Sequence, residues 1–295
     1  MPDAFRHVPP SPRREAGVRV LEGFGVVFAW GLRRGFSARR FRVTAVLTIG
    51  VGVLLALLHG GASDAVFRLW IGLDRGMLAI GVPLAALALA GGGFAEEVAD
   101  QTLVYHLVRP VSRATVFLAR FAAGIVPCVL TAMALILAVM LPTRAALPPV
   151  TYAKAALVAG VGAATVGAVY FSLGALFRRG LIAGLVYTFV VEAIFQFLPG
   201  SVQNLSLMHH VRSLFHRWCD ADFAEGSRRV AARVATWADG APRLDGRPED
   251  VVFQRATEVW STAGNALLVC AVVLAVALLL GARAVKRADY ALKDA

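Results

Sequence analysis

The stretch GGGFAEEVADQTLVYHLVRPVSRATVFLARF, residues 91–121, joins two long apolar runs through a charged segment that contains a proline. Three glycines end the first run, and Glu96 and Glu97 follow where the first turn of a new helix would favour negative charge. An apolar stripe comes next and Pro110 ends it; the stripe consists of Leu103, Val104, Leu107 and Val108. The stretch predicts a short amphipathic helix between two membrane spans, with a solvated loop as the alternative.

The composition places the chain in a membrane. Its 295 residues are 58% hydrophobic and 17% charged, with a mean hydropathy of +0.67. A soluble domain has about a quarter charged residues. The formal net charge of +11 is explained by basic residues that flank membrane spans on the cytoplasmic side. We therefore expect membrane lipid, and no nucleic acid, as a partner.

Six apolar runs predict an all-α integral membrane protein with six transmembrane helices. A helix needs about 20 apolar residues to cross roughly 30 Å of hydrocarbon. The predicted spans are Val43–Leu58, Gly76–Phe94, Phe121–Leu141, Ala153–Phe177, Leu181–Leu198 and Ala263–Ala284. Small residues are dense in the fourth and fifth spans (Gly160, Ala164, Gly167, Ala168, Gly180, Gly184). They favour close helix packing, either within one bundle or at a dimer face.

The loop charges predict the orientation. Basic residues gather before span 1 and after spans 2, 4 and 6: Arg33, Arg34, Arg39, Arg40, Arg42, Arg109, Arg113, Arg120, Arg178, Arg179, Arg283, Lys286 and Arg287. The short loops of the other side carry Arg68, Arg75 and Arg144. By the positive-inside rule both termini are cytoplasmic. The N-terminus has no apolar core of a cleaved signal peptide.

We interpret residues 1–295 as a single membrane domain: a cytoplasmic segment at 1–42, spans 1–5 within 43–198, an outer segment at 199–262, span 6 at 263–284, and a cytoplasmic tail at 285–295. The first segment predicts an interfacial amphipathic helix, whose apolar side carries Val20, Phe24, Val27, Phe28 and Trp30. A weak seventh span is the alternative, against which Glu22 and three glycines argue.

The outer segment predicts short outer helices. Leu207, Val211, Leu214, Phe215 and Trp218 recur at helical spacing, and residues 228–237 form a second candidate. We expect the apolar side of the first helix on the membrane and its histidines and arginines toward water. Asp64 and Asp74 flank an outer loop and are expected to be solvated.

Glu192, inside span 5, is the polar residue that most needs an explanation, because an ionisable group in a span is expensive. With Tyr187 it lines or gates a path, or it makes a structural hydrogen bond near the outer interface or snorkels toward it; Tyr187 and Tyr170 are its candidate partners. Residues 209–222, HHVRSLFHRWCDAD, include His210, His216 and Cys219 but lack a recurring metal-ligand pattern. We expect no metal, no disulfide framework and no catalytic constellation, so the chain is not predicted to be an enzyme.

The charged stretch resembles the segment after the second span of ABC-2 type transporter permeases. The matching residues are Glu97, Thr102, Leu103, Leu107, Pro110, Val111, Ser112, Arg113, Leu118 and Arg120. Gln101 departs from the pattern, since glycine is usual before the threonine. The resemblance extends to the six-span topology, to SLGALFRRG at residues 172–180 and to GLVYTFVVEAIFQFLPG at residues 184–200.

The resemblance implies the membrane subunit of an ATP-driven exporter in a bacterial cytoplasmic (inner) membrane. Such permeases form homodimers or heterodimers with a second permease and work with a separate ABC ATPase subunit, which binds ATP and Mg. By carry-over, the coupling helix contains Glu97, Thr102, Leu107, Arg109, Pro110 and Arg113, and the N-terminal amphipathic helix also touches the ATPase. The chain has no GxxxxGK[ST] phosphate-binding loop. The alternative is a non-transporting scaffold or sensor whose outer loop binds a partner.

Overall fold

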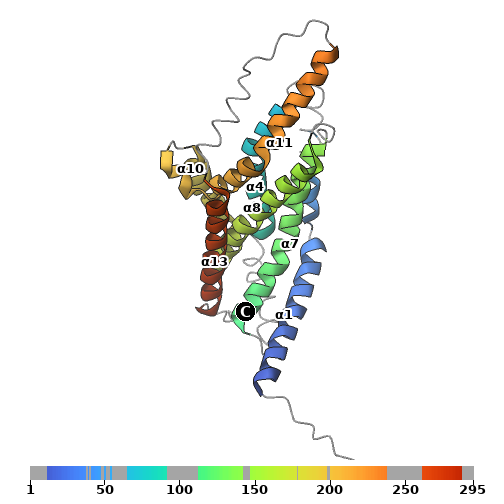
Figure 1. Cartoon of the computed structure of the whole chain (residues 1–295). Helices are drawn as coiled ribbons and strands as arrows, with labels where there is room; N and C mark the ends of the chain where they lie inside the picture. The colour runs from blue at the N-terminus through green and yellow to red at the C-terminus, as the bar shows by residue number, and fades with distance from the viewer. Residues whose placement is uncertain are drawn as a thin grey trace, which may run out of the picture.

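The structure is a computed structural model that describes residues 12–37, 39, 41–47, 50, 54, 65–91, 112–141, 147–177, 179–197, 200–237 and 261–287. In this part of the chain all regular secondary structure is helical (Figure 1). Four of its helices are long and apolar enough to cross a membrane: Leu69–Ala90, Arg113–Met140, Pro149–Leu176 and Ala263–Arg287. The all-α class is therefore confirmed for the described residues, and the four candidate spans indicate a multi-pass membrane protein.

The candidate spans follow the predicted ones, with two differences. Spans 3, 4 and 6 correspond to α7 (Arg113–Met140), α8 (Pro149–Leu176) and α13 (Ala263–Arg287). The second span begins earlier than expected and consists of α3 (Ala65–Ile71), the π-helical η1 (Gly72–Gly81) and α4 (Val82–Ala90). The fifth is divided into α9 (Gly180–Val186), π-helical η3 (Tyr187–Ala193) and α10 (Ile194–Phe197). Its apolar part, Gly180–Ala193, is shorter than the four candidate spans. Most of predicted span 1 lies outside the described residues.

Helix α8 is the centre of the bundle. In its most apolar window 72% of the residues are buried, against 17% for α13. Its small residues admit the neighbouring helices: a Cβ at Gly160 would lie 3.4 Å from Val129 of α7, and one at Gly167 would lie 2.5 Å from Ile125. Without side chains at these positions, side chains of α7 pack directly on the backbone of α8. These glycines therefore lie at helix contacts within the bundle, which is one of the two roles predicted for the small residues.

The basic junctions between helices gather at one end of the bundle. Gly281 of α13 packs against the Phe117 ring near the start of α7, and a Cβ at Gly180 would lie 3.2 Å from the carbonyl oxygen of Gly91. The start of α7 and the end of α13 lie together at the lower end of Figure 1. Basic residues lie at the ends of the helices there: Arg113 begins α7, Arg179 precedes α9, and Lys286 and Arg287 lie in the last turn of α13. The predicted topology requires this grouping.

The N-terminal helix forms, but its placement corrects the expected one. Helix α1 (Pro12–Ser37) runs along α7 and does not lie across the end of the bundle (Figure 1). Val27 is buried in a cluster with Phe117 and Phe171, and a Cβ at Gly35 would lie 3.5 Å from Pro127. Glycines at positions 31 and 35 share one face of α1 and allow this lengthwise contact. Helix α1 is not among the four candidate spans.

The outer segment also differs from the prediction of two short helices. A 3₁₀ turn, η4 (Gly200–Leu205), leads into one continuous helix, α11 (Leu207–Trp237). No proline lies between these bounds to interrupt it. Figure 1 shows α11 starting inside the bundle near α10 and extending beyond the end opposite the start of α7.

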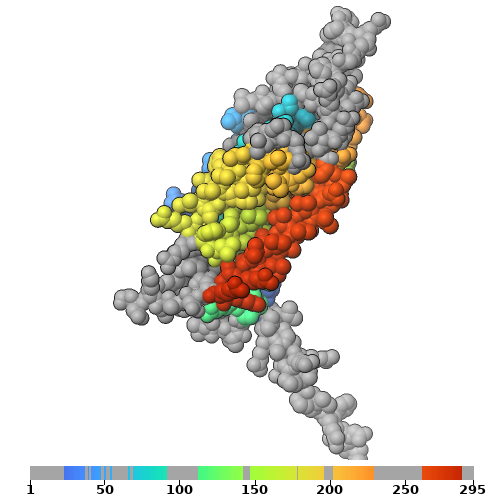
Figure 2. All heavy atoms as spheres, turned by 90° about the vertical axis from the view of Figure 1, so that its left-hand side faces the viewer, coloured from blue at the N-terminus to red at the C-terminus, as the bar shows by residue number. Residues whose placement is uncertain are grey.

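An apolar face covers one side of the molecule. Figure 2 shows α13 lying next to the segment α9–η3 on this side. Both carry exposed aliphatic and aromatic side chains, among them Ile182, Phe189, Val190, Leu268, Val272 and Leu279. Such a continuous apolar surface suits lipid or another membrane helix.

Candidate functional site

The predicted coupling residues fall at the edge of the described chain. Glu97, Thr102, Leu107, Arg109 and Pro110 lie outside the described residues. Arg113 is described: it is exposed and is the first residue of α7. The Ser112 hydroxyl caps this helix by accepting a hydrogen bond of 3.1 Å from the backbone N–H of Thr115. The predicted coupling segment therefore continues directly into a capped, candidate membrane-spanning helix.

Near its start, α7 contacts α1 through a cation–π interaction. The guanidinium carbon of Arg120 lies 4.8 Å from the centre of the Trp30 ring, and that of Arg34 lies 5.3 Å from it. Cations over an indole face are attracted by the ring quadrupole. Gly31 makes room for Arg120, because a Cβ there would lie 2.5 Å from Nη1 of Arg120. This contact lies about two helical turns from Arg113 along α7.

Glu192 anchors the start of α11. It lies in η3 and is 1% exposed. Its Oε1 accepts hydrogen bonds from the Tyr187 hydroxyl (2.6 Å) and the Leu207 N–H (3.2 Å). Its Oε2 accepts from the Ser206 hydroxyl (2.7 Å) and the Met208 N–H (3.0 Å). A carboxylate at a helix N-terminus satisfies unpaired N–H groups and the helix dipole together.

The partner of Glu192 is therefore Tyr187, one of the two candidates. The other, Tyr170, instead hydrogen-bonds Thr188, with 2.6 Å between the two hydroxyl oxygens. Ser206 completes the cap by accepting from the His209 N–H at 3.2 Å. The geometry is that of a buried helix cap between η3 and α11; the path-lining or gating role stays a prediction.

Asp74 was expected to be solvated, and this prediction is wrong. It lies in η1, is 2% exposed and is paired with Arg212 of α11. The Arg212 Nε donates to Oδ1 at 2.7 Å and Nη2 donates to Oδ2 at 2.6 Å. Such a bidentate pair fixes both position and orientation. The cause is the earlier start of the second span, which draws Asp74 into the bundle, where its charge requires a partner.

His216 extends this pair into a buried network. Its Nε2 lies 3.1 Å from Oδ1 of Asp74, and its Nδ1 lies 3.1 Å from both oxygens of Asp220. The Trp70 indole N–H of α3 donates to Oδ1 of Asp220 at 2.8 Å. Arg212, His216 and Asp220 are spaced four apart and form one stripe along α11. We call Trp70, Asp74, Arg212, His216 and Asp220 the buried charge network.

A third contact holds α11 further along. Asp222 accepts from the Thr151 hydroxyl at 2.7 Å and from Lys154 Nζ at 2.8 Å, both of α8. Burial alone would raise the pKa of Asp222, but the hydrogen bonds from Lys154 and Thr151 outweigh it and lower the pKa. Helix α11 is thus tied by carboxylates to η3, to η1 and to α8.

The first half of α11 is buried on both its apolar and its polar side, since Leu207, Val211 and Phe215 are buried as well. His209, His210, Arg212 and His216 are buried against the bundle and do not point to water. Within the described residues, no three His, Cys, Asp or Glu side chains form a group suited to a metal ion. His210 is engaged elsewhere, with Nε2 2.9 Å from the Asn204 carbonyl oxygen, and burial raises the pKa of the Cys219 thiol to about 12.

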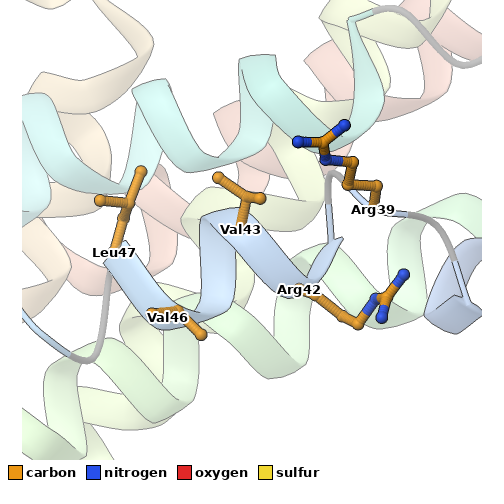
Figure 3. A pocket seen from close by; sticks show the side chains of 5 residues that line it. All are labelled: Arg39, Arg42, Val43, Val46 and Leu47. Carbon is orange, nitrogen blue, oxygen red and sulfur yellow. The ribbon is translucent and has the colours of Figure 1, made fainter.

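A shallow hollow of about 430 Å³ lies on the helical segment 41–47. It is lined by Arg39, Arg42, Val43, Val46 and Leu47. Figure 3 shows Arg39, Val43 and Leu47 projecting on one side of the segment and Arg42 and Val46 on the other. The hollow has no carboxylate among these residues and contains no member of the buried charge network.

The sequence contained a signal for the missed network. Residues 212, 216 and 220 repeat every four positions beside the apolar stripe of α11, so they had to lie near the face that packs. Asp74 stands with Arg75 in the otherwise apolar context LWIGLDRGML, residues 69–78, where a carboxylate needs a cation. What the sequence did not contain was the pairing between them.

No protein-family model matches the chain, and no curated protein matches it.

Proposed function

We propose that the chain is the membrane-spanning subunit of an ATP-driven transporter of the ABC-2 type, working as a dimer with a separate ATPase subunit in export across a bacterial inner membrane. The observation that carries the proposal is the charged segment within residues 91–121. It connects two candidate spans, Leu69–Ala90 and Arg113–Met140, at the end of the bundle where basic residues gather.

The segment is well placed to transmit a push. It follows α4 and leads into the capped start of α7. Helix α1 is joined to α7 within two turns of that start, through Trp30 and Arg120. In the proposed mechanism, closure of the ATPase dimer moves the segment containing Glu97 and Arg113, and α4, α7 and α1 tilt together.

The far end of the bundle would respond through α11. Helix α4 continues through η1 to Asp74, which holds Arg212 of α11. Glu192 of η3 holds the first turn of the same helix. Both carboxylates lie in π-helical segments, which often occur at functional sites. A tilt of the second span would therefore carry α11 with it, and α11 is the element that we propose opens and closes the far side.

The proposal is tested by co-purification with an ATPase encoded beside this chain. Glu97→Arg and Arg113→Glu reverse charges in the predicted coupling segment and are expected to weaken association or to uncouple ATP hydrolysis. The matched control is Arg144→Glu, a charge reversal in a short loop predicted for the other side. Equal association and equal ATPase activity in all three variants would refute the coupling assignment.

One observation favours a second candidate, a sensor or scaffold. Helix α11 extends beyond the bundle, which offers a surface for a partner outside the membrane (Figure 1). The two candidates differ in the ATPase: a sensor keeps its function in membranes from which the ATPase is deleted, whereas the permease loses it.

A further inference from the structure

The buried charge network contains a histidine between two acids. We infer that His216 is a proton-binding site, and that the bound proton locks α11 to the second span. The inference rests on contacts within the chain and not on the proposed transport function.

When Asp74 and Asp220 are both ionised, the hydrogen-bond geometry requires two protons on the His216 ring. Nε2 of His216 lies 3.1 Å from an oxygen of Asp74, and Nδ1 lies 3.1 Å from the oxygens of Asp220. A carboxylate oxygen is an acceptor, and a neutral imidazole has one N–H and one lone pair. With one proton, a lone pair would face a carboxylate across one of these contacts. With both acids ionised, both contacts are hydrogen bonds only when His216 is an imidazolium.

The local charge count agrees with the geometry. Asp74 and Asp220 contribute two negative charges, and Arg212 and protonated His216 contribute two positive ones, so the buried set is neutral. Arg75 lies 3.3 Å from Oδ2 of Asp74, but its side chain is 63% exposed and water screens its charge. Among the residues that the structure describes, the other groups facing the site include the Trp70 ring, 5.2 Å from the His216 ring, and His209. On α8, Lys154 and Asp222 pair with each other.

The surroundings set the pH range in which the proton is held. Burial alone would lower the pKa of His216, but the hydrogen bonds to Asp220 and Asp74 outweigh it and raise the pKa above its ordinary value of 6.5. Burial, with smaller contributions from the nearby His210, Arg212 and His216, lowers the pKa of His209 to about 4, so His209 stays neutral in this range.

A raised pKa in the folded state fixes the sign of the effect. The stabilisation from protonated His216 is fully present below pH 6.5, the value in the unfolded chain, and is lost as the pH rises through the folded-state value. Above that point the site carries a net negative charge, and one of its contacts turns repulsive. Helix α11 then loses part of its attachment to η1 and α3, while Glu192 and Asp222 still hold it elsewhere.

The direct test is a nitrogen-15 NMR titration of the full chain, labelled at its six histidines, in lipid nanodiscs between pH 5.5 and 9. His216→Gln assigns the resonances. The expected result is an imidazolium at pH 6.5 with a midpoint above that value, and a midpoint lower by about 1 pH unit or more in Asp220→Asn, because a carboxylate within hydrogen-bonding distance shifts a pKa by that much. A neutral ring at pH 6.5, or a midpoint unchanged by Asp220→Asn, would overturn the inference.

A second measurement tests whether the proton on His216 stabilises the folded chain. The midpoint of thermal unfolding is expected to fall from pH 6.5 to pH 9 in the unmodified chain, and to fall less in His216→Lys, which keeps a positive charge over this range. The matched control is His210→Gln, a buried histidine outside the network that should retain the full dependence. Equal pH profiles for the unmodified chain and His216→Lys would contradict the lock even if the titration succeeded.

Discussion

Replacing Asp74 with asparagine keeps the shape of the side chain and removes the charge that Arg212 and His216 share. The side chains of Asp74 and Arg212 are 3% and 4% exposed, so water cannot replace the lost carboxylate. Removing one partner of such a buried pair costs about 3–5 kcal/mol. The asparagine oxygen still accepts one hydrogen bond, which places Asp74→Asn near the lower value, or roughly a hundredfold in the unfolding equilibrium.

The assay is reversible unfolding by SDS in mixed micelles, followed by the loss of helical circular dichroism. Arg75→Gln is the matched control, because Arg75 contacts the same carboxylate from a side chain that is 63% exposed. We expect it to change the unfolding free energy by less than about 1 kcal/mol. If Asp74→Asn and Arg75→Gln unfold alike, Asp74 is not a buried counter-ion.

A double-mutant cycle isolates the pair. Asp74→Asn and Arg212→Met remove the same bidentate contact, so the combined loss is expected to be smaller than the sum of the single losses by about 1–3 kcal/mol. Strict additivity would show that the two residues do not interact, whatever each single variant does.

Three further variants test other contacts. Glu192→Gln removes the charge that caps α11 and is expected to destabilise the chain by about 1–3 kcal/mol and to speed amide exchange at residues 207–209; Tyr187→Phe, which removes one donor to Glu192, should have a smaller effect, and a reversed order would contradict the cap. Gly281→Ala drives a Cβ into the Phe117 ring and 3.0 Å from the Ser172 hydroxyl, so thermal unfolding should reveal a loss of about 1–3 kcal/mol, whereas Gly264→Ala meets nothing within 4 Å and should show none. Trp30→Ala removes the indole face from Arg120 at a cost of about 0.5–2 kcal/mol, and Trp30→Phe should recover part of it in the same assay; no recovery would argue against the cation–π contact.

The membrane helices were predictable because the length of an apolar run determines where such a helix can lie in the sequence. Spans 3, 4 and 6 begin and end within about a turn or two of the predicted bounds, since their apolar runs and flanking charges are unambiguous. The placement of α1 and the continuity of α11 were not predictable from the sequence, because both helices mix charged and apolar residues. For such helices the tertiary partner decides which face is buried, and hydropathy does not name the partner.

The candidate site shows the same division at the level of single residues. Glu192 was singled out because a carboxylate in an apolar run is rare, and Tyr187, one of its two proposed partners, proved to be the contact. Asp74 was missed because it stands near the start of its span, next to Arg75, where solvation was the simpler explanation. Its pairing with Arg212 spans 138 positions in the sequence, and no local pattern encodes it.

The most direct test of the proposed function is the ATPase activity of the reconstituted complex. The full chain and an ATPase encoded beside it would be purified together in lipid nanodiscs, with Arg113→Glu and the control Arg144→Glu in parallel. We expect ATP hydrolysis by the complex that depends on the membrane chain, falls in Arg113→Glu and is retained in Arg144→Glu. Hydrolysis that is the same with and without this chain, or that is untouched by Arg113→Glu, would contradict it.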